Sequence, residues 1–187
     1  MDIRKYRIST NFQKLAQEID FNVSLDARAN VDFSRGSTEP RIQADVVIKG
    51  GEIQKIVDKC VNIIKQDIYK KEDFPYTLTN WVYIVDRDSP EGANYHNHTK
   101  MKHINTKGEW SFVYYVTMPD KLEGDDGYIY FKDKKEVISF IPEVGELLIF
   151  PAELLHFPKV NPLSEEKRRV IAGTISKCEY KSEKTFL

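Results

Sequence analysis

Three histidines constrain the fold of this chain more than any other feature. His96 and His98 are separated by a single residue, and His156 lies much later in the sequence. In an extended segment residues i and i+2 point to the same face, so both imidazole rings of a His-x-His pair can reach one ion. A third histidine from a distant segment completes a set of three ligands on one side of a metal. The sequence therefore nominates a metal site, for which the chain would have to return residue 156 to the 96–98 segment.

The residues around the pair favour an extended conformation. The segment 92–99 follows a turn-forming run, Asp-Ser-Pro-Glu-Gly at 88–92, and lacks the apolar period of a helix. On a helix, the rings of His96 and His98 would point in different directions. The spacing alone does not establish a metal site, because two of the four histidines of the chain can fall in one loop by chance.

The surroundings of His156 point to a buried strand. The run Leu-Leu-Ile-Phe at 147–150 follows a Gly-containing turn at 142–146 and is followed by Pro151. We expect the strand to end at this proline. His156 is then expected just beyond the strand, where the chain returns over the open end of a barrel.

A second buried strand is expected at 167–175, and it begins with two adjacent arginines, Arg168 and Arg169. Its small, β-branched and apolar residues indicate burial. An arginine facing inward there would need an anion to compensate its charge, and a carboxylate ligand would fit. The alternative is that both arginines are surface residues at the end of the strand.

Taken in order, these motifs resemble the iron(II)- and 2-oxoglutarate-dependent oxygenases, and most closely the small members found in phages and marine bacteria. The resemblance covers roughly residues 78–178. It implies a double-stranded β-helix, the jelly-roll barrel, with iron near one open end. The motifs that carry it are His96-x-His98, the segments 110–119 and 127–133, Pro142-x-x-Gly145 with the strand to Pro151 and His156, and Arg168.

The resemblance also assigns roles to residues. His96 and His156 match the first and last metal ligands, and His98 stands where most of the superfamily has Asp or Glu. Arg168 matches the basic residue that binds the far carboxylate of 2-oxoglutarate. It is preferred to Arg169 because it shares a strand face with small residues, whereas Arg169 aligns with bulky isoleucines. Two further residues, Tyr83 and Tyr115, are expected to bind the cosubstrate.

Several other aromatic and histidine side chains could contribute to the site. Tyr95, Tyr114, Tyr128 and Tyr130 are candidates to line a pocket, because tyrosine combines apolar area with a donor. Tyrosine is also an ordinary residue of β-strands. His103, the fourth histidine, lies in what is expected to be a long loop beside the site.

The fold class expected is β-rich α+β, in a single domain spanning residues 1–187. Residues 1–76 form an N-terminal extension with supporting helices packed on the larger sheet, and residues 77–180 form the jelly-roll core. Helices are expected at 11–19 and 53–70 from their apolar period, and a strand within 41–49. Further strands are expected at 77–86 and 111–118, with a hairpin at 127–140 that turns at 132–135.

Composition narrows the possible partners and location. The 28 basic and 29 acidic residues leave a formal net charge of −1, which gives no overall field for nucleic acid or membrane. Cys60 and Cys178 lack metal or redox spacing, which favours a reduced, cytoplasmic compartment. The sequence has no signal-peptide core near Met1 and no apolar run of membrane-spanning length, so a soluble protein is expected.

The resemblance implies a dioxygenase that uses Fe(II), 2-oxoglutarate and dioxygen to hydroxylate a substrate, with release of succinate and CO2. The substrate is not legible in the sequence, and both a small molecule and a protein or peptide side chain fit. Two alternatives stay open. A cupin-type three-His metalloenzyme would not use 2-oxoglutarate, and a non-catalytic binding module would keep only the barrel.

Overall fold

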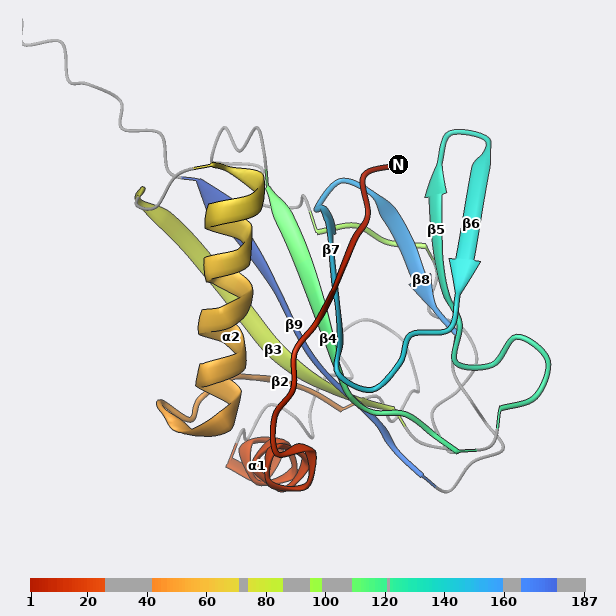
Figure 1. The fold of residues 1–187 in the computed structure, drawn as a ribbon. Helices are drawn as coiled ribbons and strands as arrows, with labels where there is room; N and C mark the ends of the chain where they lie inside the picture. The colour runs from red at the N-terminus through yellow and green to blue at the C-terminus, as the bar shows by residue number, and fades with distance from the viewer. Residues whose placement is uncertain are drawn as a thin grey trace, which may run out of the picture.

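A computed structural model describes residues 1–25, 42–70, 74–85, 95–98, 109–120, 122–159 and 166–177. Two helices, a larger sheet and a smaller sheet form three layers, with the larger sheet in the middle (Figure 1). The larger sheet has the strand order β1-β7-β4-β9-β3-β2, and the smaller sheet has the order β6-β5-β8. All pairings between neighbouring strands are antiparallel. This is the β-rich α+β arrangement that the sequence predicts.

Four strands form the centre of the larger sheet, and their side chains point alternately to its two faces. They are β3 (Tyr76–Val85), β4 (Trp110–Thr117), β7 (Glu146–Pro151) and β9 (Arg168–Lys177). Strand β7 extends through Pro151, one residue further than expected. The smaller sheet contains β5 (Ile129–Asp133), β6 (Glu136–Phe140) and β8 (Leu155–Pro158).

The N-terminal region supplies both edges of the larger sheet as well as its helices. Strand β1 (Arg4–Arg7) pairs with β7, and β2 (Ile42–Asp45) pairs with β3. Strand β1 is absent from the sequence-based prediction, and β2 occupies only the first part of the expected segment. The described part of the N-terminal region therefore contributes two strands to the larger sheet and does not only cover it.

The two helices cover the face of the larger sheet that points away from the smaller sheet (Figure 1). Helix α1 (Phe12–Leu25) extends beyond the predicted end at residue 19, and α2 (Gly51–Ile63) continues as a π-helical segment, η1 (Ile64–Ile68). Apolar side chains of both helices pack on the sheet in one cluster of buried residues. No helix among the described residues has the length and hydrophobicity to cross a membrane.

A second apolar cluster fills the space between the two sheets. It includes Tyr115, Phe150 and Val170 of the larger sheet, with Ile129 and Phe131 of the smaller sheet. Side chains at alternate positions of β4, β7 and β9 therefore enter different cores, one under the helices and one inside the barrel. The candidate site lies in the barrel core.

Candidate metal centre

The structure brings the three predicted histidines together. His156 lies on β8, and His96 forms an isolated antiparallel bridge with it. The amide of His96 donates to the carbonyl of His156 at 3.0 Å, and the amide of His156 donates to the carbonyl of His96 at 2.9 Å. His156 therefore lies just beyond β7, as expected, and a short strand of its own, β8, positions it.

The expected extended conformation of the His-x-His pair follows from these backbone contacts. The amide of His98 donates to the carbonyl of Ala152 at 2.9 Å, which fixes the segment at a second point, on the turn between β7 and β8. Residues 96 and 98 therefore direct their rings to the same side. The ring centroids of His96 and His98 are 5.4 Å apart.

The three imidazoles are close enough to share one ion. Their potential ligand atoms all lie within 4.8 Å of one another. The ring of His156 lies 4.3 Å from that of His96 and 4.9 Å from that of His98, measured between centroids. His156 is buried, His98 is half-buried and His96 is exposed. The cluster thus reaches from the barrel core to solvent.

Aromatic side chains hold the two less exposed rings. The His156 ring packs edge-on against Phe150 at 4.9 Å, and Phe131 lies 6.1 Å from it. The His98 ring lies 5.2 Å from the ring of Trp81 on β3. These aromatic side chains restrict rotation of the His98 and His156 rings and cover one side of the histidine cluster.

Burial keeps the two rings in the form that binds metal. It lowers the pKa of His98 to about 4 and the pKa of His156 to about 3, and repulsion from the neighbouring histidines adds to the effect. Both imidazoles are therefore neutral near pH 7, and neutral imidazole is the metal ligand. Nδ1 of His156 lies 3.1 Å from the carbonyl oxygen of Leu154. Because a carbonyl only accepts, Nδ1 carries the proton and Nε2 keeps a free lone pair.

The ligand set contains three histidines and, among the described residues, no carboxylate. Three neutral nitrogen ligands fit Fe(II), and the same set also suits Zn(II), Ni(II) and Cu(II). Compared with a His-x-Asp site, this set leaves one more unit of positive charge on a bound divalent ion. The residues present therefore fit an iron site with a more positive centre.

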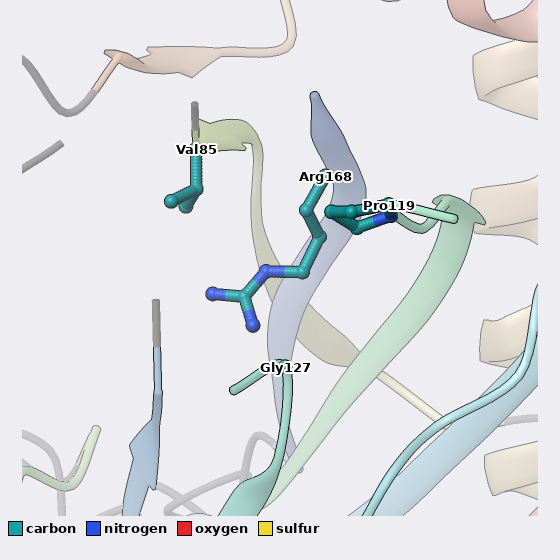
Figure 2. Close-up of a pocket in the computed structure, with 4 residues that line it drawn as sticks. All are labelled: Val85, Pro119, Gly127 and Arg168. Carbon is teal, nitrogen blue, oxygen red and sulfur yellow. The ribbon is translucent and has the colours of Figure 1, made fainter. Parts of the chain in front are cut away.

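The two adjacent arginines of β9 point to opposite faces of the sheet, as strand alternation predicts. Arg168 is only 4% exposed, and its Nη1 donates to the carbonyl of Lys159 at 2.9 Å. Figure 2 shows its guanidinium extending into a narrow pocket lined also by Val85, Pro119 and Gly127. Arg169 lies on the helix side, where Nε and Nη2 each donate to one oxygen of Asp20 at 2.8 Å.

Both tyrosines predicted to bind the cosubstrate lie on the inner face, in one row across three strands. Val170 of β9 pairs with Tyr83 on one side and with Tyr115 on the other. Tyr115 is buried, and burial raises the pKa of its phenol, while the charge of Arg168 opposes that rise. The phenol therefore remains protonated and can donate a hydrogen bond beside the guanidinium.

The other tyrosine candidates lie elsewhere. Tyr114 faces the helices, and its hydroxyl donates to the carbonyl of Ile8 at 2.8 Å. Tyr128 and Tyr130 form a row of rings with Phe157 and Tyr95 on the side of the smaller sheet opposite His156. His103 lies outside the described residues.

One polar residue at the metal end was not predicted. Glu109, which precedes β4, is 8% exposed and accepts a hydrogen bond from the hydroxyl of Ser176 at 2.8 Å. The only hint in the sequence is that Glu109 is two residues before Ser111 and so would share its face of the sheet, opposite to that of Trp110. A single glutamate at a strand end is usually exposed.

Neither the family models nor the curated proteins yield a match to this sequence. Solved structures do match. A viral collagen prolyl hydroxylase from Paramecium bursaria Chlorella virus-1, determined as a 2-oxoglutarate complex, has a TM-score of 0.60 at 15% identity over 95% of this chain and 96% of the other. A prolyl-4-hydroxylase from Pseudomonas putida has a TM-score of 0.58 at 16% identity, covering 95% and 93%.

A third similar structure is a Trichoplax adhaerens prolyl hydroxylase in complex with a peptide fragment of hypoxia inducible factor. Its TM-score is 0.62 at 14% identity, and the match covers 94% of this chain and 83% of the other. At such identities the likeness establishes the fold. The chain thus has the fold of the prolyl hydroxylases, with three clustered histidines in its barrel.

Proposed function

We propose that the protein is an Fe(II)- and 2-oxoglutarate-dependent oxygenase that hydroxylates a substrate and releases succinate and CO2. The observation that carries this proposal is the presence of two groups in one barrel: a cluster of three histidines and a buried arginine, Arg168. Neither group contributes to folding in the way an apolar residue would. Together they match the two things such an enzyme must hold, a metal ion and a dicarboxylate.

His96, His98 and His156 would hold the metal. When bound, iron with 2-oxoglutarate supplies oxidative decarboxylation of the cosubstrate coupled to oxidation of a substrate C–H bond. The protein supplies the ligand geometry. The Leu154 carbonyl fixes the tautomer of His156, and Trp81 limits the orientation of His98.

Arg168 and Tyr115 would hold the far carboxylate of 2-oxoglutarate. A guanidinium can bind a carboxylate through two parallel hydrogen bonds, and a protonated phenol beside it can add a third. Burial strengthens these bonds because water does not compete for the same atoms. Apolar residues of the barrel core, among them Phe131 and Phe150, would limit the access of water to a bound cosubstrate.

The substrate class follows less directly. A small molecule and a protein or peptide side chain both remain compatible with the site. The similar structures are prolyl hydroxylases, and one of them holds a peptide. A prolyl peptide is therefore the first substrate to test. The sequence resemblance to small phage and marine bacterial oxygenases adds no narrower class.

Succinate release tests the proposal. Protein purified without a His tag should convert 2-oxoglutarate to succinate with Fe(II) and dioxygen, slowly even without substrate. A His98→Ala variant and an iron-free sample serve as controls. Succinate formation that is equal in all three samples would contradict the proposal.

The three-histidine set specifically supports one other function, a cupin-type metalloenzyme without 2-oxoglutarate. The same experiment separates the two. Such an enzyme would bind metal in wild type and lose it in His98→Ala, but release no succinate. A barrel that binds no metal in either form would instead indicate a non-catalytic binding module.

A further inference from the structure

The inner face of the larger sheet becomes polar toward the metal end. The hydroxyls of Ser111 and Thr174, which pair across β4 and β9, lie 3.2 Å apart. One row further along β9, Ser176 donates its hydroxyl to Oε1 of Glu109 at 2.8 Å. Because Ser176 is an even number of residues from Arg168, its side chain is on the same, inner face.

The second carboxylate oxygen of Glu109 has no such contact. Oε2 is buried and makes no hydrogen bond within the described part of the chain. Glu109 is only 8% exposed and Ser176 only 7%. A buried carboxylate oxygen without a donor is unfavourable, and proteins that retain one commonly have a role for it.

Within the described part of the chain, no lysine or arginine forms an ion pair with Glu109. Its effect is felt by the phenol of Tyr69, whose pKa is raised to about 12, first by burial and then by the charge of Glu109. Ser176 supplies one neutral hydrogen bond and no charge. Among the described residues, one of the two carboxylate oxygens of Glu109 therefore has a hydrogen bond, and the charge of Glu109 has no opposite charge paired with it.

Backbone hydrogen bonds connect Glu109 to the histidine cluster. The amide of Ala152 donates to the carbonyl of Glu109 at 3.0 Å, and the carbonyl of Ala152 accepts from the amide of His98 at 2.9 Å. Each of these two hydrogen bonds joins neighbouring backbone segments, so the backbones of Glu109 and His98 are about 10 Å apart. Glu109 is not among the clustered metal-binding groups. Its position is suited to a molecule that lies beside the metal rather than to the metal itself.

We propose that Glu109 is a specificity-determining residue that accepts hydrogen bonds from a cationic group of the substrate, an ammonium or a guanidinium. This inference rests on the proposed oxygenase function. A cation with N–H donors supplies both things the carboxylate lacks, the second hydrogen bond and the opposite charge. A neutral donor would supply only the first. The preferred substrate therefore carries a lysine-like or arginine-like group beside the carbon that is oxidised.

Binding of small probes tests this proposal. The probes are the N-acetyl N-methylamides of lysine and arginine, with those of norleucine and citrulline as neutral matches, titrated into protein loaded with Zn(II) and 2-oxoglutarate. At least one cationic probe should bind wild type at least tenfold more tightly than its neutral match. The lysine and arginine arms distinguish an ammonium from a guanidinium. Equal binding of cationic and neutral probes, or no binding of either at millimolar concentration, would overturn the proposal.

A variant locates the effect. Glu109→Gln keeps the shape and the bond from Ser176 but removes the charge, so it should lose at least tenfold in affinity for the cationic probe. Glu136→Gln, a change of an exposed acid on the β5–β6 hairpin, should lose none. Unchanged selectivity in Glu109→Gln would overturn the assignment. If that variant does not fold, the comparison of probes on wild type still decides the question.

A failure of the Glu109 proposal can be distinguished from a failure of the proposed oxygenase function. Zn(II) binding and probe selectivity require no turnover, whereas succinate release requires no probe. Cation selectivity without succinate release would keep a cation-accepting site at Glu109 and reject the oxygenase. Succinate release without cation selectivity would reject only the role of Glu109.

Discussion

The two faces of the larger sheet are built from the same strands but from very different side chains. Toward the helices, the sheet presents fully buried apolar residues such as Phe112, Ile149 and Ile171. Toward the smaller sheet, it presents Arg168, Tyr115 and a row of hydroxyl groups alongside apolar residues. The helix-covered face thus stabilises the fold, whereas the inner face contains groups that are costly to bury. This contrast between the two faces is the one that the proposed oxygenase function requires.

Close packing is visible at one glycine of the helix-covered face. A Cβ atom on Gly173 would lie 2.6 Å from Cζ of Phe112 and 2.7 Å from the carbonyl oxygen of Thr79. No side chain other than hydrogen fits there without a shift of backbone. Residue 173 lies between Ala172 and Thr174, which belong to the inner face. Mutations at neighbouring positions of β9 should therefore have separate effects on stability and on ligand binding.

The largest expected effect is on metal binding. His156→Ala removes the most buried ligand, so the affinity for Fe(II) or a surrogate ion should fall by about a hundredfold or more. Losing even a residue that only supports a metal ligand commonly lowers metal affinity 10–100-fold. Phe157→Ala changes the next residue of β8, whose side chain points to the opposite side, and should leave metal content unchanged. Metal analysis and titration of both variants measure this. Equal metal content in His156→Ala and wild type would exclude the three-histidine site.

The next effect concerns the two arginines. Loss of the Arg168 guanidinium from a desolvated carboxylate pair should cost about 2–5 kcal/mol, or on the order of thirtyfold to several-thousandfold in 2-oxoglutarate affinity. Arg169→Ala loses a partly exposed pair with Asp20, and should change that affinity by less than about tenfold. Apparent 2-oxoglutarate constants of the metal-loaded variants test the contrast. A larger effect from Arg169 than from Arg168 would reverse the assignment of faces.

Much of this architecture could be predicted from the sequence because β3, β4 and β9 are covered on both sides. Strands that are buried on both faces read as nearly continuous apolar runs in the sequence. Strands β1 and β8 left no such pattern. Strand β1 is four residues long, three of them basic, and exists because it pairs with the edge of β7. Strand β8 is equally short and ends in a proline.

Tertiary contacts also explain the longer first helix. Its last residues have weak helical propensity, yet the Asn22 side chain is buried and bonds to the backbone. The amide group of this side chain donates to the carbonyl of Asp45, the last residue of β2, and its oxygen accepts from the amide of Val47 just beyond that strand. The histidine cluster was predictable from spacing and resemblance. Glu109 was not, because its environment depends on Ser176, a residue far along the chain. Such pairings leave no local signal.

Lowering the pH should reduce the free energy of unfolding of the metal-free protein, because burial keeps His98 and His156 in their neutral form. The pKa values of His98, about 4, and His156, about 3, lie below the ordinary 6.5. Between pH 6.5 and pH 4 the unfolded chain therefore binds protons that the native state does not, and stability is lost as the pH falls. The loss is about 2 kcal/mol per histidine between pH 6.5 and about pH 5. Urea unfolding at both pH values measures it. The variant His98→Gln should lose roughly half of this added dependence, and an unchanged dependence would contradict the account.

The smallest effect belongs to the helix-covered face. Gly173→Ala should destabilise the protein by about 1–3 kcal/mol, because the new methyl group collides with the Phe112 ring and the Thr79 backbone. Metal affinity and 2-oxoglutarate affinity of the folded variant should stay within about threefold of wild type. Thermal or urea unfolding gives the first quantity and calorimetry the second. A selective loss of 2-oxoglutarate binding without loss of stability would mean that the two faces are not independent.

Calorimetric titration of 2-oxoglutarate tests the central claim most directly, namely that metal and cosubstrate bind together in one barrel. Wild-type protein is titrated with and without Fe(II) under anaerobic conditions, and Arg168→Ala is titrated with Fe(II). The account predicts tight binding only where the metal and Arg168 are both present. Binding that is equally tight without metal, or unaffected by removal of Arg168, would contradict it.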